Sequence, residues 1–161
     1  MVKNYENIQV KQKPDAIAII RGSNSYSDIH GTVYFYQANE GVMVTANING
    51  LPHDIGLCNS KVFGFHIHGG ESCTGTEASP FEDTGSHYDK FKCDHPHHSG
   101  DMPPLFNNNG MAYMSFLTNR IYVADIIGKT VVIHNNPDEF NSQPAGNSGT
   151  RIACGKIKRI F

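Results

Sequence analysis

The sequence predicts an all-β domain in which eight antiparallel strands form a barrel or sandwich and two long loops carry the function. Short β-branched and aromatic runs recur with turn residues between them, and no stretch of a dozen residues shows helical periodicity. Regularly spaced short strands favour a barrel or sandwich because this arrangement covers the apolar face of each strand and limits exposed edges.

The eight predicted strands are defined by local composition. Seven runs are rich in β-branched and aromatic residues, at 16–21, 31–36, 42–48, 61–68, 111–116, 131–135 and 152–157. An eighth strand is predicted at 104–106, where Asn107, Asn108, Asn109 and Gly110 follow as a tight turn. Asn-Gly suits such a turn because both residues tolerate positive φ.

Length and charge limit the classes of function. The 161 residues suit one domain, which we place at 16–161, after an amino-terminal extension at 1–15. A net charge of −2 gives no basic surface for nucleic acid, and no apolar run approaches the length of about 18 residues that a membrane span needs. Residues 1–13 are polar and do not resemble a signal peptide, so we expect a cytoplasmic protein.

Two connections, 69–103 and 136–149, are much longer than the others. Connections of more than about 12 to 15 residues without secondary structure are uncommon in compact domains unless they are functional or disordered. The first connection contains four of the nine histidines and also Asp101. A bound metal would supply the ordering free energy that such a loop lacks in apolar contacts.

His66 and His68 lie on one predicted strand. The strand period of two places both side chains on one face, opposite Phe63, Phe65 and Ile67. Two imidazoles on one side of a strand can bind one copper or zinc ion. Taken alone, such a pair is more often a solvated or hydrogen-bonded strand face.

A second group of histidines lies in the first long connection. His87, His95, His98 and Asp101 together would make a closed tetrahedral set for zinc. The alternative is a polar, histidine-rich surface loop. On composition alone His97 could replace His98, and spacing does not choose between them.

His134 and Arg151 are weak signals by themselves. His134 ends an apolar run, where a lone histidine is ordinarily a strand-end residue with a local hydrogen bond. Arg151 stands at the start of the last predicted strand, where an arginine is ordinarily a surface charge.

Four motifs in order resemble the copper/zinc superoxide dismutase family. They are Gly-Phe-His-Ile-His at 64–68, the segment from Gly85 to Asp101, Val-Val-Ile-His at 131–134 and Gly-Asn-Ser-Gly-Thr-Arg-Ile-Ala-Cys-Gly at 146–155. The resemblance runs from about residue 16 to residue 157. It implies an eight-stranded Greek-key barrel or sandwich.

The resemblance also implies one copper ion and one zinc ion per chain. The copper ligands would be His66, His68, His87 and His134, and the zinc ligands would be His87, His95, His98 and Asp101. The His-x-Gly-Asp motif of the family selects His98 over His97. Asp138 matches a carboxylate that links one copper histidine to one zinc histidine, here His66 and His95. Cys73 and Cys154 match the single disulfide of the family, and Cys58 and Cys93 are expected to be free thiols.

The activity implied is the conversion of two superoxide radicals to dioxygen and hydrogen peroxide, as an antioxidant defence. Histidine-bound copper would cycle between two oxidation states, and the zinc would be structural. Arg151 would hold the anion, and His87 would carry a proton. The resemblance further implies a homodimer, and Thr150 stands where a proline in some relatives goes with strict need of a copper chaperone, so activation without a chaperone is expected.

The chain departs from the family pattern before Arg151. Family members commonly carry a lysine and a threonine where this chain has Pro144 and Ala145, and no lysine or arginine occurs between Asn135 and Thr150. Steering of an anionic substrate is therefore expected either to be weaker or to depend on Arg151 and on lysines elsewhere in the chain. Two other classes of function compete with the enzyme: a copper-handling protein without activity, and a β domain in which zinc alone is bound as a structural ion.

Overall fold

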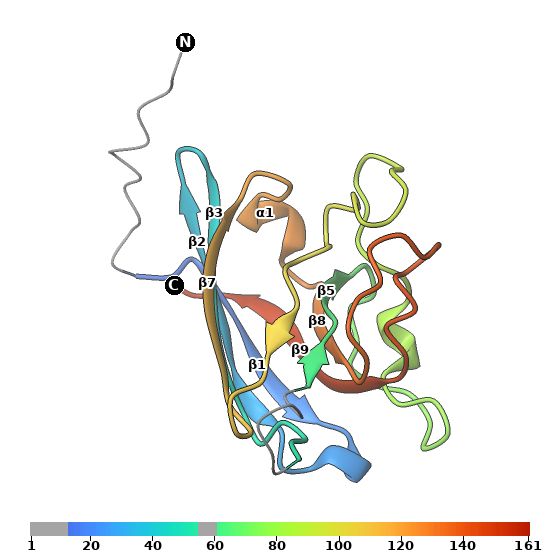
Figure 1. The fold of residues 1–161 in the computed structure, drawn as a ribbon. Coiled ribbons are helices and arrows are strands. Elements are labelled where there is room, and N and C mark those ends of the chain that lie inside the picture. Colours follow the sequence, from blue (N-terminus) through green and yellow to red (C-terminus); the bar gives the residue numbers. More distant parts are fainter. Residues whose placement is uncertain (1–12, 55–60) are drawn as a thin grey trace.

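The computed structural model describes residues 13–54 and 61–161. Seven strands form one antiparallel sheet in the order β5-β8-β9-β1-β2-β3-β7, and β4 pairs with β6 in a second sheet of two strands. Figure 1 shows the large sheet curled into a half-barrel, with β2, β3 and β7 on one side and β5 and β8 on the other. The chain leaves the sheet after β3 and returns to it as β7, which pairs with β3 as in a Greek key.

Each element has the following bounds. The strands are β1 (Ala16–Gly22), β2 (His30–Ala38), β3 (Gly41–Asn49), β4 (Val62–Phe63), β5 (Phe65–His68), β6 (Leu105–Phe106), β7 (Ala112–Thr118), β8 (Thr130–His134) and β9 (Arg151–Arg159). Short helical turns lie at η1 (Asn24–Tyr26), η2 (Glu82–Thr84) and α1 (Val123–Ile126). No helix within 13–54 or 61–161 is long and apolar enough to cross a membrane.

All eight predicted strands are present, but the one predicted at 61–68 is divided at Gly64 into β4 and β5. At this point the chain that follows β8 lies against the strand. The Gly64 N–H donates to the Asn136 carbonyl at 2.7 Å, and its carbonyl accepts from the His134 N–H at 2.9 Å. A Cβ on residue 64 would lie 2.9 Å from the Ser148 side chain, so glycine is required here.

The predicted turn after β6 is also present. Asn109 and Gly110 have φ values of 52° and 87°, and Asn108 pairs with Met111 across the turn. The three helical turns were not predicted because none exceeds four residues, which is too short to produce a periodic apolar pattern.

The core lies inside the curl of the large sheet. Alternate residues of β1, β2 and β3 point inward, and their buried side chains include Ile20, Val33, Phe35 and Val44. β5 and β8 differ because every residue of both strands is buried. The outer face of these two strands is covered by the two long connections, which Figure 1 shows beside β5 and β8 in green and orange. The covered face carries the histidines described next.

Candidate metal centre

The pleat of β5 separates its side chains into two sets. Phe65 and Ile67 are fully buried in the hydrophobic core, whereas His66 and His68 point to the opposite face, which the long connections cover. The exposed fractions of the two histidines are 0% and 1%. The predicted pair of imidazoles on one face is therefore present, but it is enclosed and not solvated.

The connection after β5 returns alongside that strand. The Tyr88 N–H donates to the Ile67 carbonyl at 2.7 Å, and the Ile67 N–H donates to the Gly100 carbonyl at 2.8 Å. Bridges pair His68 with His87 and His66 with Asp101. A backbone that passes this close needs glycine, since a Cβ on Gly100 would lie 2.2 Å from the Ile67 oxygen. Pairing with β5 thus fixes His87 and Asp101 beside the strand histidines.

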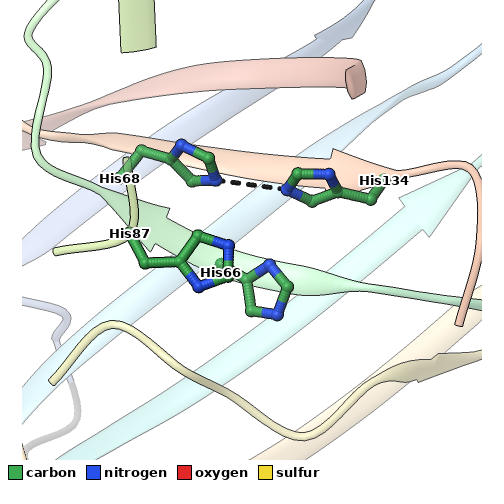
Figure 2. Close-up of side chains that lie close together, drawn as sticks. All are labelled: His66, His68, His87 and His134. Atoms are coloured by element: carbon green, nitrogen blue, oxygen red, sulfur yellow. Dashed lines mark hydrogen bonds between the residues drawn. The ribbon is translucent and has the colours of Figure 1, made fainter. Parts of the chain in front are cut away.

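The first cluster, which we call the copper cluster after the predicted ion, joins four histidines from three segments. Their ligand atoms lie within 4.8 Å of one another, and Figure 2 shows the four rings turned toward a common centre: His66, His68, His87 and His134. The copper cluster lies between β5, the end of β8 and the first long connection.

Two nitrogens of the copper cluster face each other as acceptors. The Nε2 atoms of His68 and His134 lie 3.1 Å apart. The opposite nitrogen of each ring, Nδ1, donates to a carbonyl: His68 to Gly85 at 2.8 Å and His134 to Gly149 at 3.2 Å. In a neutral imidazole with hydrogen on Nδ1, Nε2 carries only a lone pair. Two facing lone pairs repel each other unless a cation is bound between them, so this geometry fits a metal.

The other two rings of the cluster also direct buried nitrogens inward. His66 uses Nε2 to donate to the Asp138 carboxylate at 2.7 Å, and its Nδ1 has no hydrogen-bond partner among the described residues. His87 directs Nδ1 to Asp101, and its Nε2 is likewise buried and without a described partner. Unpartnered buried nitrogens are costly in a protein interior unless a ligand satisfies them.

The second cluster, which we call the zinc cluster, contains His87, His95, His98 and Asp101. The Nδ1 atoms of the three histidines lie 2.7, 3.1 and 3.3 Å from the Asp101 carboxylate oxygens. The nitrogens of His95 and His98 nevertheless lack hydrogen-bond alignment with that carboxylate. Tetrahedral zinc with bonds of about 2.0 to 2.1 Å would place its ligand atoms about 3.3 Å apart, so the distances from His95 and His98 fit the ion, whereas His87 is hydrogen-bonded to Asp101. His87 belongs to both clusters.

Burial keeps His66, His68 and His134 of the copper cluster neutral. Burial, followed by the nearby His87 and His134, lowers the pKa of His66 from 6.5 to about 2. Burial also lowers the pKa of His134 to about 4 and that of His68 well below 6.5. For Asp101 burial raises the pKa, but the hydrogen bond from His87 and the neighbouring histidines outweigh it, and the net shift is downward. Neutral imidazoles and an ionised carboxylate are the forms that bind metals.

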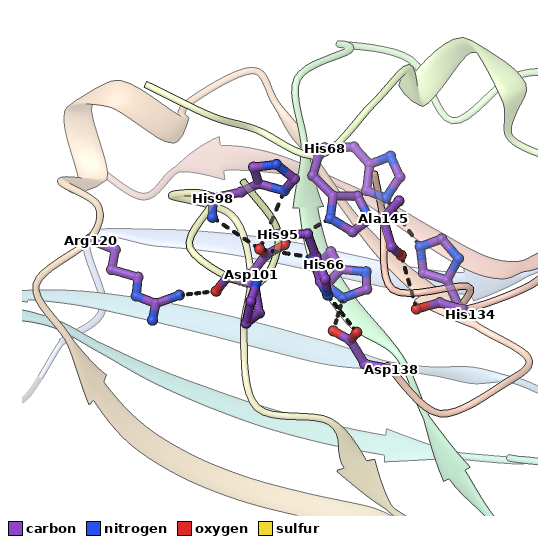
Figure 3. A network of polar contacts seen from close by, with 12 residues as sticks. His66, His68, His95, His98, Asp101, Arg120, His134, Asp138 and Ala145 are labelled. Atoms are coloured by element: carbon purple, nitrogen blue, oxygen red, sulfur yellow. Dashed lines mark hydrogen bonds and ion pairs between the residues drawn. The ribbon is translucent and has the colours of Figure 1, made fainter. Parts of the chain in front are cut away.

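Asp138 lies between one ring of each cluster. Its two carboxylate oxygens accept from Nε2 of His66 and from Nε2 of His95, each at 2.7 Å (Figure 3). Gly146 makes room for this contact. It has a φ of 67°, and a Cβ there would lie 1.9 Å from Oδ1 of Asp138. The carboxylate therefore fixes the tautomer of both rings, with the lone pair on Nδ1.

An open cleft of about 740 Å³ leads to the copper cluster. His68, His87, His134 and Arg151 line it, and Arg151 is the only charged residue among its described lining residues. The Arg151 guanidinium donates to the carbonyls of Phe81 at 3.3 Å and Gly85 at 2.9 Å. The Gly85 carbonyl also accepts from His68, so one backbone oxygen orients both the cation and a copper-cluster ring.

The remaining residues considered in the sequence are the four cysteines and His97. Cys73 and Cys154 form a disulfide with a sulfur-to-sulfur distance of 2.00 Å, which joins the first long connection to β9. Cys93 is free and exposed, and Cys58 lies outside the described residues. His97 is exposed and belongs to neither cluster, whereas His98 belongs to the zinc cluster.

Sequence reasoning missed the groups that orient the site through the backbone. The carbonyls of Gly85 and Gly149 carry no signal of residue type, and no sequence pattern marks the Gln143 side chain, which bonds the main chain of His95. Only Gly146 could have been found, since a glycine in a long functional loop often marks positive φ or close approach.

Comparisons with known proteins show the family of the chain. The profile of the family described as "Copper/zinc superoxide dismutase (SODC)" matches residues 29–157. The chain is 31% identical to "Superoxide dismutase [Cu-Zn]" of Deinococcus radiodurans, over 82% of this chain and 79% of that one. It is 34% identical to the protein of the same name from Legionella pneumophila, over 80% and 77% of the two chains. It is 30% identical to "Superoxide dismutase [Cu-Zn] 4" of Dictyostelium discoideum, over 90% and 98%. The chain belongs to the copper/zinc superoxide dismutase family.

Proposed function

We propose that the protein is a superoxide dismutase that converts two superoxide radicals and two protons to dioxygen and hydrogen peroxide. The observation that carries the proposal is the pair of facing Nε2 lone pairs of His68 and His134, which lie at 3.1 Å in a cleft shared with Arg151. A cation-binding cluster beside a fixed positive charge suits a small anionic substrate. No nucleophile is needed for this reaction.

The two clusters would hold different metals. His66, His68, His87 and His134 would bind copper, since an all-imidazole set suits that ion. His87, His95, His98 and Asp101 would bind zinc as a closed structural site. Copper bound in this cleft would supply the one-electron oxidation and reduction that dismutation requires.

The protein's own residues bind the anion and move a proton. Arg151 attracts superoxide to the cleft and orients it, since its guanidinium stays charged and is fixed by two carbonyls. His87 lines the same cleft, and its Nε2 has no described partner. We assign to this atom one of the two protons of the reaction: it would carry that proton in the half of the cycle in which it does not bind the metal and donate it to the departing peroxide, and solvent would supply the second proton.

The test is superoxide dismutation by purified protein loaded with copper and zinc, with metal content measured on the same sample and metal-free protein as the control. Fast turnover at about one copper and one zinc per chain is expected. Both metals bound without turnover would instead indicate a copper-handling protein, and zinc alone, with copper offered, a structural zinc domain.

Three finer features are part of the proposal. We propose a homodimer, as the family resemblance implies, and expect sedimentation to give twice the chain mass at micromolar concentration.

Thr150 supports activation by copper salts without a chaperone, which reconstitution in vitro would test. We also propose a cytoplasmic location, to be tested by cell fractionation.

A further inference from the structure

We propose that Gln143 is a positioning residue for the zinc ligand His95. Gln143 lies in the second long connection, and its side chain reaches across to the first. The inference rests on the zinc site of the proposed function and assigns that site a residue outside both clusters and outside the family motifs in the sequence.

The contact consists of two hydrogen bonds between one side-chain amide and one residue's main chain. The His95 N–H donates to Oε1 of Gln143 at 3.1 Å, and Nε2 of Gln143 donates to the His95 carbonyl at 2.6 Å. Glutamine suits this contact because its amide offers one acceptor and one donor on the same planar group. Both polar groups of the His95 backbone are thereby satisfied.

No other described residue bonds the main chain of His95. The residues before it, 91–94, are exposed, and the main-chain hydrogen bond nearest to it joins the His97 N–H to the Asp94 carbonyl at 2.8 Å, within the same connection. Arg120 donates to the Pro96 carbonyl at 2.7 Å and does not bond the main chain of His95. The main-chain N–H and carbonyl of His95 bond only Gln143 among the described residues. Without Gln143, the main chain of His95 has no hydrogen bond to a described residue.

The ring of His95 is held by the same connection at a second point. Its Nε2 donates to Oδ1 of Asp138 at 2.7 Å (Figure 3), while its Nδ1 points into the zinc cluster, 3.1 Å from an Asp101 oxygen but without a hydrogen bond. Backbone and ring are thus held separately, and the two together fix where Nδ1 lies. If the backbone anchor is lost, the ring remains tied to Asp138 but pivots about that contact, and Nδ1 moves away from the position that zinc requires.

The test compares zinc binding among variants of the full chain. Gln143→Met keeps the length of the side chain and removes both hydrogen bonds, and Gln143→Glu keeps only the acceptor for the His95 N–H. The zinc dissociation constant, measured by competition with a chelator, is expected to rise about tenfold in Gln143→Met and less in Gln143→Glu. Asn141→Ala is the matched control, since Asn141 is exposed, lies in the same connection and makes no described hydrogen bond.

A second readout separates positioning from mere support of the fold. The absorption spectrum of Co²⁺ bound in place of zinc reports ligand geometry at full occupancy, and it is expected to change in Gln143→Met but not in Asn141→Ala. A purely structural role would lower the stability of the metal-free protein and leave both the zinc affinity and the cobalt spectrum as in the wild type. That result would overturn the proposal. Failure of the wild type itself to bind zinc would overturn both this inference and the zinc site on which it rests.

Discussion

At the scale of single residues, Arg151 is the fixed positive charge of the cleft. Its guanidinium is held by the carbonyls of Phe81 and Gly85, and it forms no described hydrogen bond with a side chain of either cluster. Arg151→Ala is therefore expected to lower kcat/KM for superoxide by about tenfold to a hundredfold without changing metal content. Arg151→Lys keeps the charge but not the planar donors, and should retain an intermediate rate. Unchanged turnover of the alanine variant, with both metals bound, would remove Arg151 from the mechanism.

His134 separates the two metals because it belongs to the copper cluster only. Its ring is buried, and it faces His68 at the end of β8. In His134→Ala, copper content and turnover are expected to be lost, whereas zinc is expected to remain near one per chain. Elemental analysis after dialysis against both metals measures this directly. Loss of zinc to the same extent as copper would show that the two clusters are not independent at this residue.

At the scale of elements, the disulfide between Cys73 and Cys154 joins the first long connection to β9 across a sequence separation of 81. Replacing both cysteines by serine is expected to lower the free energy of unfolding by about 2 to 5 kcal/mol. Urea unfolding of the metal-free protein measures the change. Cys93→Ser is the control, since that cysteine is exposed and free, and it should stay within about 0.5 kcal/mol of the wild type. A double serine variant as stable as the wild type would mean that the disulfide does not stabilise the fold.

Strands and turns that depend only on neighbouring residues were predicted well from the sequence. The period of two along β5 was enough to place His66 and His68 together, and Asn109-Gly110 was enough to predict the turn before β7. The break at Gly64 could not be predicted, because it depends on the approach of a segment about 70 residues later. Local pattern gives the direction of a side chain but not which distant backbone approaches it.

The same distinction applies to the site. Donor type and order along the chain identified the residues of both clusters, but spacing alone could not choose between His97 and His98, and the family motif was needed. In the structure His87 and Asp101 form bridges with β5, His97 between them is exposed, and His98 lies in the zinc cluster. The hydrogen bonds to main-chain carbonyls, from His68 to Gly85 and from Gln143 to His95, could not be predicted, because every residue type has a carbonyl. They became visible only in the structure.

At the scale of the whole molecule, buried histidines make the metal-free protein sensitive to acid. The unfolded chain binds a proton at each histidine below about pH 6.5, whereas the folded chain does so only near pH 4 at His134 and near pH 2 at His66. The charge of Asp101 raises the pKa of His66, and that of Asp138 raises the pKa of His134, but burial lowers both pKa values by more. Because the unfolded state binds more protons in this window, the free energy of unfolding falls as the pH falls.

The expected slope approaches about 1.4 kcal/mol per pH unit for each such histidine well below pH 6.5. Thermal unfolding of the metal-free protein between pH 7 and pH 5 measures it. His134→Gln removes one of the histidines and should flatten the dependence. A melting temperature that does not change across this range would contradict the assignment of these rings as neutral in the fold.

The distribution of charge predicts how the substrate reaches the cleft. The chain has a net charge of −2, and the described lining of the cleft carries one cation, Arg151. A second positive charge at the rim should therefore accelerate capture of superoxide. Ala78 lines the cleft, is exposed and has no side-chain hydrogen bond to lose, so Ala78→Lys adds the charge with little disturbance. Its kcat/KM is expected to be about twofold to tenfold above the wild type at low ionic strength.

Salt distinguishes steering from any other effect of that lysine. The Debye length falls from about 30 Å at 0.01 M salt to about 8 Å at 0.15 M, so the gain of Ala78→Lys should shrink as salt is added. Ala78→Gln, of similar size but neutral, should match the wild type at every ionic strength, and Ala78→Glu should be slower than the wild type at low salt. A gain shared by the glutamine variant, or one that salt does not reduce, would show that capture in this cleft is limited by access or by the copper cluster and not by the single charge of Arg151.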